Sequence, residues 1–216
     1  MGKKLIVIVG AGPGVSSSVS RIFGSKGFKV ILVARNEQAL AELVRNLEAR
    51  GVEAYGATAN AADPAALQTA FEQIKRNHGI PEALVYNAAV IKLGTASSLT
   101  EAELLDDLNV NVVGALSSAL QVIPDFIERR SGTILFTGGG FALTPSYELA
   151  SLSIGKAALR SLVYTLGEEL APHGIHVGTI TIAGTVAVNT KFDPDRIAQA
   201  YWDMYEKQNE REIIYQ

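Results

Sequence analysis

The sequence contains no cysteine among its 216 residues. Disulfide bonds and thiolate metal sites are therefore excluded, and the absence is compatible with a reducing compartment. Only three histidines are present, His78, His173 and His176, and their spacing is not that of a ligand set. We predict no bound metal.

Positive charge and long apolar runs are also scarce. The formal net charge is −3, so no basic surface for nucleic acid or an anionic membrane is indicated. The apolar run at residues 5–9 is interrupted by Gly10, Gly12, Pro13 and Gly14, which is not the pattern of a signal peptide. No segment approaches a membrane-spanning length. We expect a cytoplasmic protein with no nucleic-acid and no membrane partner.

What the sequence does contain is a regular alternation of short apolar runs and amphipathic segments. The runs predict β-strands at residues 5–9, 30–33, 53–57, 83–86, 133–136, 176–182 and 212–215. Asp63-Pro64 and Thr100-Glu101-Ala102-Glu103 are typical of helix starts. Because apolar strands need cover on both faces, the alternation predicts an α/β fold, a doubly wound parallel sheet in a single domain, residues 1–216.

A glycine-rich turn, Gly10-Ala11-Gly12-Pro13-Gly14-Val15-Ser16, follows the first predicted strand. Glycines let the backbone approach a pyrophosphate, and the helix beginning near Val15 offers free N–H groups and the positive end of its dipole. We predict a phosphate-binding turn, with Ser16 as a candidate hydroxyl contact. A tight turn without a ligand is the alternative.

The end of the second predicted strand indicates which dinucleotide would bind. Val33-Ala34-Arg35-Asn36 holds no acid for a ribose 2′-hydroxyl, and the first acid is Glu37. The Arg35 guanidinium suits a 2′-phosphate, so NADP(H) is favoured over NAD(H). The alternative is that Arg35 is a solvated residue at a helix start.

These segments, with others, resemble the short-chain dehydrogenase/reductase family from residue 3 to about 190. Gly10 and Gly14 match its glycine turn, and Tyr86-Asn87-Ala88-Ala89 resembles its Asn-Asn-Ala-Gly segment. Ala183-Gly184-Thr185 stands where the family has Pro-Gly beside the nicotinamide, and Asn60 where it has an aspartate near the adenine. The resemblance implies a Rossmann-type sheet with strand order 3-2-1-4-5-6-7, in which Asn87 is mainly structural. It implies a cofactor site formed by Gly10, Gly12, Gly14, Val15, Ser16, Arg35, Asn60, Asn87, Ala88, Lys156, Gly184 and Thr185.

The catalytic residues of that family are only half present. Lys156-Ala157-Ala158-Leu159 resembles its catalytic helix, with Lys156 implied to bind the nicotinamide ribose, and Asn111 matches the asparagine of its water relay. The expected tyrosine is Leu152 and the expected serine is Gly139. Leu152 cannot donate a proton, and Gly139 has no side chain to polarise a carbonyl.

Other hydroxyl groups lie near these gaps in the sequence. Tyr147 precedes the helix, and Ser153 shares a helix face with Lys156. For both we prefer ordinary packing roles over a catalytic one. Ser146 and Ser151 are interpreted as turn and N-cap residues. The glycines 138–140 either form an anion-binding nest or let a ligand approach the strand end.

The C-terminal region, about residues 185–216, is expected to form a short substrate lid that includes a helix at 194–207. The long helices expected at about 101–129 and 149–171 correspond to the family's subunit interfaces. They predict a homodimer or a homotetramer, although core packing also explains their apolar content.

Three functional hypotheses stay open. The first is an NADP(H)-dependent oxidoreductase with a non-standard proton donor, acting on a small organic carbonyl, imine or conjugated substrate. The second is a catalytically silent nucleotide-binding regulator or sensor, and the third an interaction module without cofactor. The glycine turn, Arg35 and Lys156 argue against the third. We prefer the first by family resemblance, because hydride transfer needs only aligned reactants.

Overall fold

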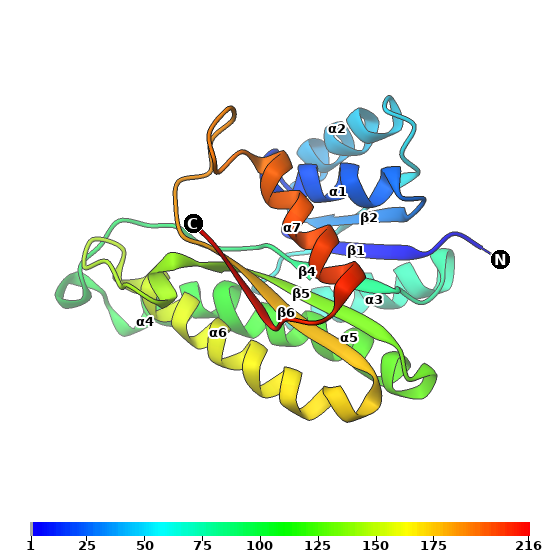
Figure 1. Ribbon diagram of the computed structural model, residues 1–216. Helices are drawn as coiled ribbons and strands as arrows, with labels where there is room; N and C mark the ends of the chain where they lie inside the picture. Colours follow the sequence, from blue (N-terminus) through cyan, green and yellow to red (C-terminus); the bar gives the residue numbers. More distant parts are fainter. Residues whose placement is uncertain (1) are drawn as a thin grey trace.

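The computed structural model describes residues 2–216 as a three-layer α/β/α sandwich (Figure 1). Its seven strands form one parallel sheet in the order β3-β2-β1-β4-β5-β6-β7. The strands are β1 (Leu5–Val9), β2 (Lys29–Ala34), β3 (Ala54–Thr58), β4 (Ala83–Tyr86), β5 (Gly132–Gly139), β6 (Ile175–Ile182) and β7 (Glu212–Tyr215). The predicted single-domain Rossmann-type fold and its strand order are confirmed.

Helices cover both faces of the sheet. On one face lie α1 (Val15–Ser25), α2 (Glu37–Glu48) and α7 (Pro194–Lys207), and on the other α3 (Pro64–His78), α5 (Gly114–Arg129) and α6 (Ala150–Leu170), with α4 (Glu101–Leu108) leading into α5. Strand β1 shows why both faces must be covered. Leu5, Val7 and Val9 belong to one core and Ile6 and Ile8 to the other, and all five are buried.

Short-range signals set the helix starts. The Asp63 carboxylate accepts hydrogen bonds from the N–H groups of Ala65 and Ala66 at the start of α3. Thr100 and Glu103 form the predicted capping box of α4. The side chain of Asn36 caps α2, which leaves Arg35 just outside that helix.

Strand β5 runs three residues further than predicted. Its last residues, Gly138 and Gly139, pair with Thr181 and Ile182 of β6. Glycine has low strand propensity, so the sequence pattern ended the strand at residue 136. The pairing with β6 overrides that preference and carries Gly139 to the carboxyl edge of the sheet.

Helices α4 and α5 are joined without a break by a π-helical turn, Asn109–Val113. The resulting helix, Glu101–Arg129, is long and apolar enough to cross a membrane by length and composition alone. The expectation that no segment has that length is therefore wrong, because it considered only uninterrupted apolar runs. Ala115, Ala119 and Val122 are fully buried against the sheet, as in a core helix.

The C-terminal region is largely part of the body of the fold. Ile197, Tyr201 and Met204 of α7 are buried in the core, where the helix packs against α1. Strand β7 forms one edge of the sheet. The loop at residues 183–193, between β6 and α7, lies beyond the carboxyl ends of the strands (Figure 1). A lid role for this region stays a prediction.

Candidate functional site

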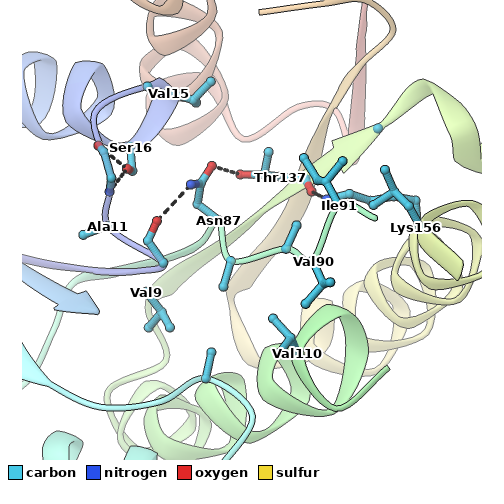
Figure 2. A pocket seen from close by; sticks show the side chains of 18 of the residues that line it. Val9, Ala11, Val15, Ser16, Asn87, Val90, Ile91, Val110, Thr137 and Lys156 are labelled. Atoms are coloured by element: carbon cyan, nitrogen blue, oxygen red, sulfur yellow. Dashed lines mark hydrogen bonds between the residues drawn. The ribbon is translucent and has the colours of Figure 1, made fainter. Parts of the chain in front are cut away.

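A cleft of about 900 Å³ follows the carboxyl ends of the strands. It opens where β1 has β2 on one side and β4 on the other, so that chain connections leave in opposite directions. Figure 2 shows Ser16 on one side of the cleft and Lys156 on the other, with Asn87 and Thr137 between them. Of the predicted site residues, the cleft is lined by Gly10, Gly12, Gly14, Val15, Ser16, Arg35, Asn60, Asn87, Ala88, Lys156 and Gly184. Thr185 and Asn111 are not part of this lining.

The glycine turn has two different requirements for glycine. Gly10 has φ +83°, and a Cβ there would lie 2.3 Å from the backbone nitrogen of Ala88, so the fold itself requires glycine. A Cβ at Gly12 or Gly14 would meet nothing within 4 Å. These two positions leave open space at the N-terminus of α1, whose N-cap has no side-chain hydrogen bond. The turn therefore fits an anionic ligand.

Ser16 stabilises this turn from within. Its hydroxyl donates to the carbonyl oxygen of Gly12 at 3.0 Å and accepts from the Gly12 N–H at 2.8 Å. The side chain is buried. The hydroxyl is engaged by the turn, and its contact with a phosphate stays a prediction.

Arg35 and Asn60 line the end of the cleft beyond the glycine turn. Arg35 is exposed, and no carboxylate in residues 2–216 forms an ion pair with it. Asn60 is also exposed, and its Oδ1 accepts a hydrogen bond from the Ala62 N–H at 3.1 Å. The guanidinium is thus available to a ligand of opposite charge.

Asn87 connects three strands, in agreement with the structural role expected for it. Its Nδ2 donates to the carbonyl oxygen of Gly10 at 3.0 Å, and its Oδ1 accepts from the Thr137 hydroxyl at 2.9 Å. Because Thr137 has given its proton to Asn87, the Tyr201 hydroxyl, 2.6 Å away, donates to Thr137. Burial raises the pKa of Tyr201, which keeps that proton in place.

Lys156 reaches the cleft from α6. Its Nζ donates to the carbonyl oxygen of Thr137 at 2.7 Å, and only 7% of the residue is exposed. Burial lowers the pKa of Lys156 to about 8. Its aliphatic chain passes over Gly139, where a Cβ would lie 3.4 Å from the lysine Cγ. A small side chain at residue 139 is therefore sterically admissible.

Asn111 lies behind the cleft, on the π-helical turn. Its Oδ1 accepts from the Val90 N–H at 2.7 Å, whereas its buried Nδ2 has no partner within residues 2–216. Gly155 of α6 packs directly against it, since a Cβ there would lie 2.9 Å from the amide nitrogen. No local sequence pattern predicted this π turn, although such turns are frequent at functional sites.

Neither candidate replacement for the missing tyrosine lines the cleft. Tyr147 is 75% exposed. The Ser153 hydroxyl donates to the carbonyl oxygen of Leu149 at 2.9 Å and accepts from the Ser146 N–H at 3.1 Å. Both observations agree with the packing roles that we preferred. Leu152, by contrast, lines the cleft as a nearly buried apolar side chain.

One polar cluster near Leu152 was missed. Ser151 was expected to cap α6, but the N-cap is Leu149 and Ser151 lies inside the helix. There its hydroxyl donates to the buried carboxylate of Asp107 at 2.7 Å. Asp107 belongs to another helix, so no local sequence pattern could have found the pair.

Comparison with known proteins gives a consistent result. Residues 4–196 match the family model described as short chain dehydrogenase. The 2,3-dihydro-2,3-dihydroxybenzoate dehydrogenase of Bacillus subtilis is 30% identical over 182 residues, which cover 84% of this chain and 70% of that protein.

Solved structures share the fold over nearly the whole chain. A metagenomic short-chain oxidoreductase in complex with NADP superposes with a TM-score of 0.90 at 23% identity, covering 99% of this chain and 97% of that one. An NADPH-bound short-chain oxidoreductase from Pseudomonas aeruginosa PAO1, described as containing an atypical catalytic center, has a TM-score of 0.86 at 19% identity and coverages of 94% and 89%.

Proposed function

Because the chain belongs to the short-chain dehydrogenase family, we propose that it is an NADP(H)-dependent oxidoreductase with an altered proton-transfer site. Its substrate is a small organic carbonyl, imine or conjugated compound. One observation carries the proposal: a single cleft holds the glycine turn, the unpaired Arg35 and Lys156. The N–H groups of the glycine turn, the Arg35 guanidinium and the Lys156 ammonium line one cleft, and these groups suit the pyrophosphate, the 2′-phosphate and the ribose of a dinucleotide.

Each part of the cleft has a role in this proposal. The open space at Gly12 and Gly14 admits a pyrophosphate against the start of α1. Arg35 pairs with a 2′-phosphate through its two-pronged guanidinium. When bound, the nicotinamide group supplies or accepts the hydride.

Lys156 positions the reacting end. One of its three N–H donors is taken by the Thr137 carbonyl, which leaves two for ribose hydroxyl groups. Asn111 offers a buried amide nitrogen without a protein partner, a position that suits a bound water. These are the roles that the family resemblance implies for Lys156 and Asn111.

The proton-transfer site is where this chain departs from the family. Leu152 and Gly139 offer no O–H group, Tyr147 lies outside the cleft, and the Ser153 hydroxyl is engaged elsewhere. Substrates that need little acid assistance therefore suit the site better than simple ketones.

The test is a fluorescence titration with NADPH and NADH. Wild type should prefer NADPH, and Arg35→Ala should weaken NADPH about ten- to hundredfold while leaving NADH unchanged, because a charge-assisted contact is worth about 1.5–3 kcal/mol. Arg45→Ala, which removes an exposed arginine of α2 outside the cleft, is the matched control. Binding of neither nucleotide would overturn the proposal, and an NADH preference would overturn its specificity.

A silent nucleotide-binding regulator is the second candidate, favoured by the same absence of O–H groups at residues 139 and 152. Tight nucleotide binding with no turnover of any carbonyl or imine substrate would select it.

For either function we propose a homodimer or homotetramer. Leu105, Val113, Leu120 and Ile154 expose apolar side chains on α4, the π turn, α5 and α6. A monomer in light scattering would contradict this assembly.

A further inference from the structure

A buried carboxylate lies at the substrate end of the cleft. Asp107 lines the cleft, yet only 3% of its side chain is exposed. Its Oδ2 accepts a hydrogen bond from the Ser151 hydroxyl at 2.7 Å, and its Oδ1 lies 3.0 Å from the Nζ of Lys92. A desolvated carboxylate is costly without such partners, so this group needs a cation at Oδ1.

The position of Asp107 is set by the packing of α4 against α6. Asn111 and Gly155 are in contact where the π turn meets α6. Asp107 and Ser151 precede these residues by four positions each, which is about one helical turn toward the helix N-termini. Ser151 is also the neighbour of Leu152, which lines the same cleft. The carboxylate and the position that lacks a proton donor therefore line the same cleft.

The side chain of Lys92, whose ammonium pairs with Asp107, is far more exposed to solvent than the carboxylate. The side chain of Lys92 is 59% exposed, and the residue belongs to the irregular segment after β4. Its hydrogen bond to Asp107, and then the charges of Asp107, Glu103 and Asp106, raise the pKa of Lys92. Asp106 and Asp107 both line the cleft beside Lys92, and the buried Asp107 carboxylate offers a site for a single cation.

We propose that Asp107, held in place by Ser151, is the counter-ion for a substrate that binds as an organic cation. The substrate is an iminium ion, and its nitrogen replaces the ammonium of Lys92 at Oδ1. The inference rests on the proposed function and names its substrate class. Ile91 and Val186, exposed apolar residues of the lining, suit an apolar remainder of the substrate.

This substrate class accounts for the missing tyrosine. In iminium reduction, a hydride from the dihydronicotinamide adds to the carbon, and the π electrons of the C=N bond become the lone pair of the nitrogen. The nitrogen keeps its own proton, and the product is a neutral amine. No protein O–H group is required for this step, and the carboxylate of Asp107 has the separate role of binding and orienting the cationic nitrogen.

The test is equilibrium binding by calorimetry, with and without NADPH, of three probes of similar shape: benzylamine, benzyl alcohol and benzoate. At neutral pH these are a cation, a neutral molecule and an anion. Wild type should bind benzylamine about tenfold or more tightly than benzyl alcohol, because one charge-assisted hydrogen bond is gained. Asp107→Asn should abolish that difference. Lys92→Met, which removes the competing ammonium, should raise the affinity for benzylamine.

Glu101→Gln is the matched control, since it removes an exposed carboxylate of α4 outside the cleft and should change benzylamine binding less than about threefold. Equal affinities for the amine and the alcohol would overturn the proposal, as would a preference for benzoate that is lost in Lys92→Met. If Asp107→Asn does not fold, the test rests on Lys92→Met. An unchanged or lower affinity of this variant for benzylamine would refute the replacement of the Lys92 ammonium by the substrate nitrogen. NADPH binding without amine selectivity would contradict this inference only. Amine selectivity without NADPH binding would contradict the proposed function.

Discussion

The two ends of the cleft differ in which of the family's functional groups they contain. At the glycine turn there is open space around Gly12 and Gly14, and Arg35 lines the cleft without an ion pair within residues 2–216, which together form the anion site that we propose. At the other end Lys156 is in place, but Leu152 and Gly139 supply no acid. Under the proposed function, nucleotide binding and proton transfer make separate demands. Binding needs backbone shape and charge, whereas proton transfer needs particular O–H groups, so one can be lost without the other.

A chain of hydrogen bonds joins the two ends. The carbonyl oxygen of Gly10 is held by Asn87, Asn87 by Thr137, and Thr137 by Tyr201 of α7. The carbonyl of the same Thr137 holds Lys156. The glycine turn and Lys156 are therefore linked through Thr137, which fixes the positions of the two ends of the cleft relative to each other.

The largest expected effect is on the free energy of unfolding, and it should distinguish Gly10, which the fold requires, from Gly12, which it does not. Gly10→Ala should lower the free energy of unfolding by about 3 kcal/mol or more, because of its positive φ and the contact with Ala88. Gly12→Ala should change it by less than about 1 kcal/mol and still weaken NADPH binding, because its methyl group enters the open space. Urea denaturation and nucleotide titration measure both. Equal destabilisation by the two substitutions would show that the space at Gly12 belongs to the fold.

A second test concerns Lys156, whose folded-state pKa of about 8 lies below the ordinary 10.5. Between these values the unfolded chain binds the extra proton, so the free energy of unfolding should rise with pH. From pH 7 to 10.5 wild type should gain about 3 kcal/mol relative to Lys156→Met, since each pKa unit corresponds to about 1.4 kcal/mol. Urea denaturation of both proteins across this range checks it, and a difference independent of pH would contradict the depressed pKa.

The smallest of the three effects concerns the empty end of the cleft. Leu152→Tyr combined with Gly139→Ser should raise kcat/KM for reduction of a simple ketone about ten- to hundredfold, since it restores a proton donor beside Lys156. The serine is sterically admissible, because its Cβ would make ordinary contact with the Lys156 side chain.

Leu152→Phe with Gly139→Ser is the matched control, because it adds the ring without the hydroxyl. It should raise ketone reduction far less than the tyrosine variant does. If the tyrosine variant gains no more than this control, the pocket differs from the family beyond residues 139 and 152.

Local patterns in the sequence predicted most of the fold. The apolar runs located all seven strands, and the caps at Asp63 and Thr100 fixed helix starts to the residue. Interactions between distant segments were beyond such patterns. The last residues of β5 are strand only because β6 pairs with them. Likewise, Ser151 is a helix residue whose partner, Asp107, is 44 positions away.

The sequence by itself determined the order of the elements, the glycine turn, Arg35 and the absence of a tyrosine at residue 152, because each depends on residue type or near neighbours. Only the tertiary structure decided which polar groups remain available to a ligand. It engaged the hydroxyls of Ser16 and Ser153 within the protein, depressed the pKa of Lys156 by burial, and brought Asp107 to the cleft. Hydrogen-bond partners and solvent exposure are properties of packed surfaces, and packing joins residues that the chain keeps far apart.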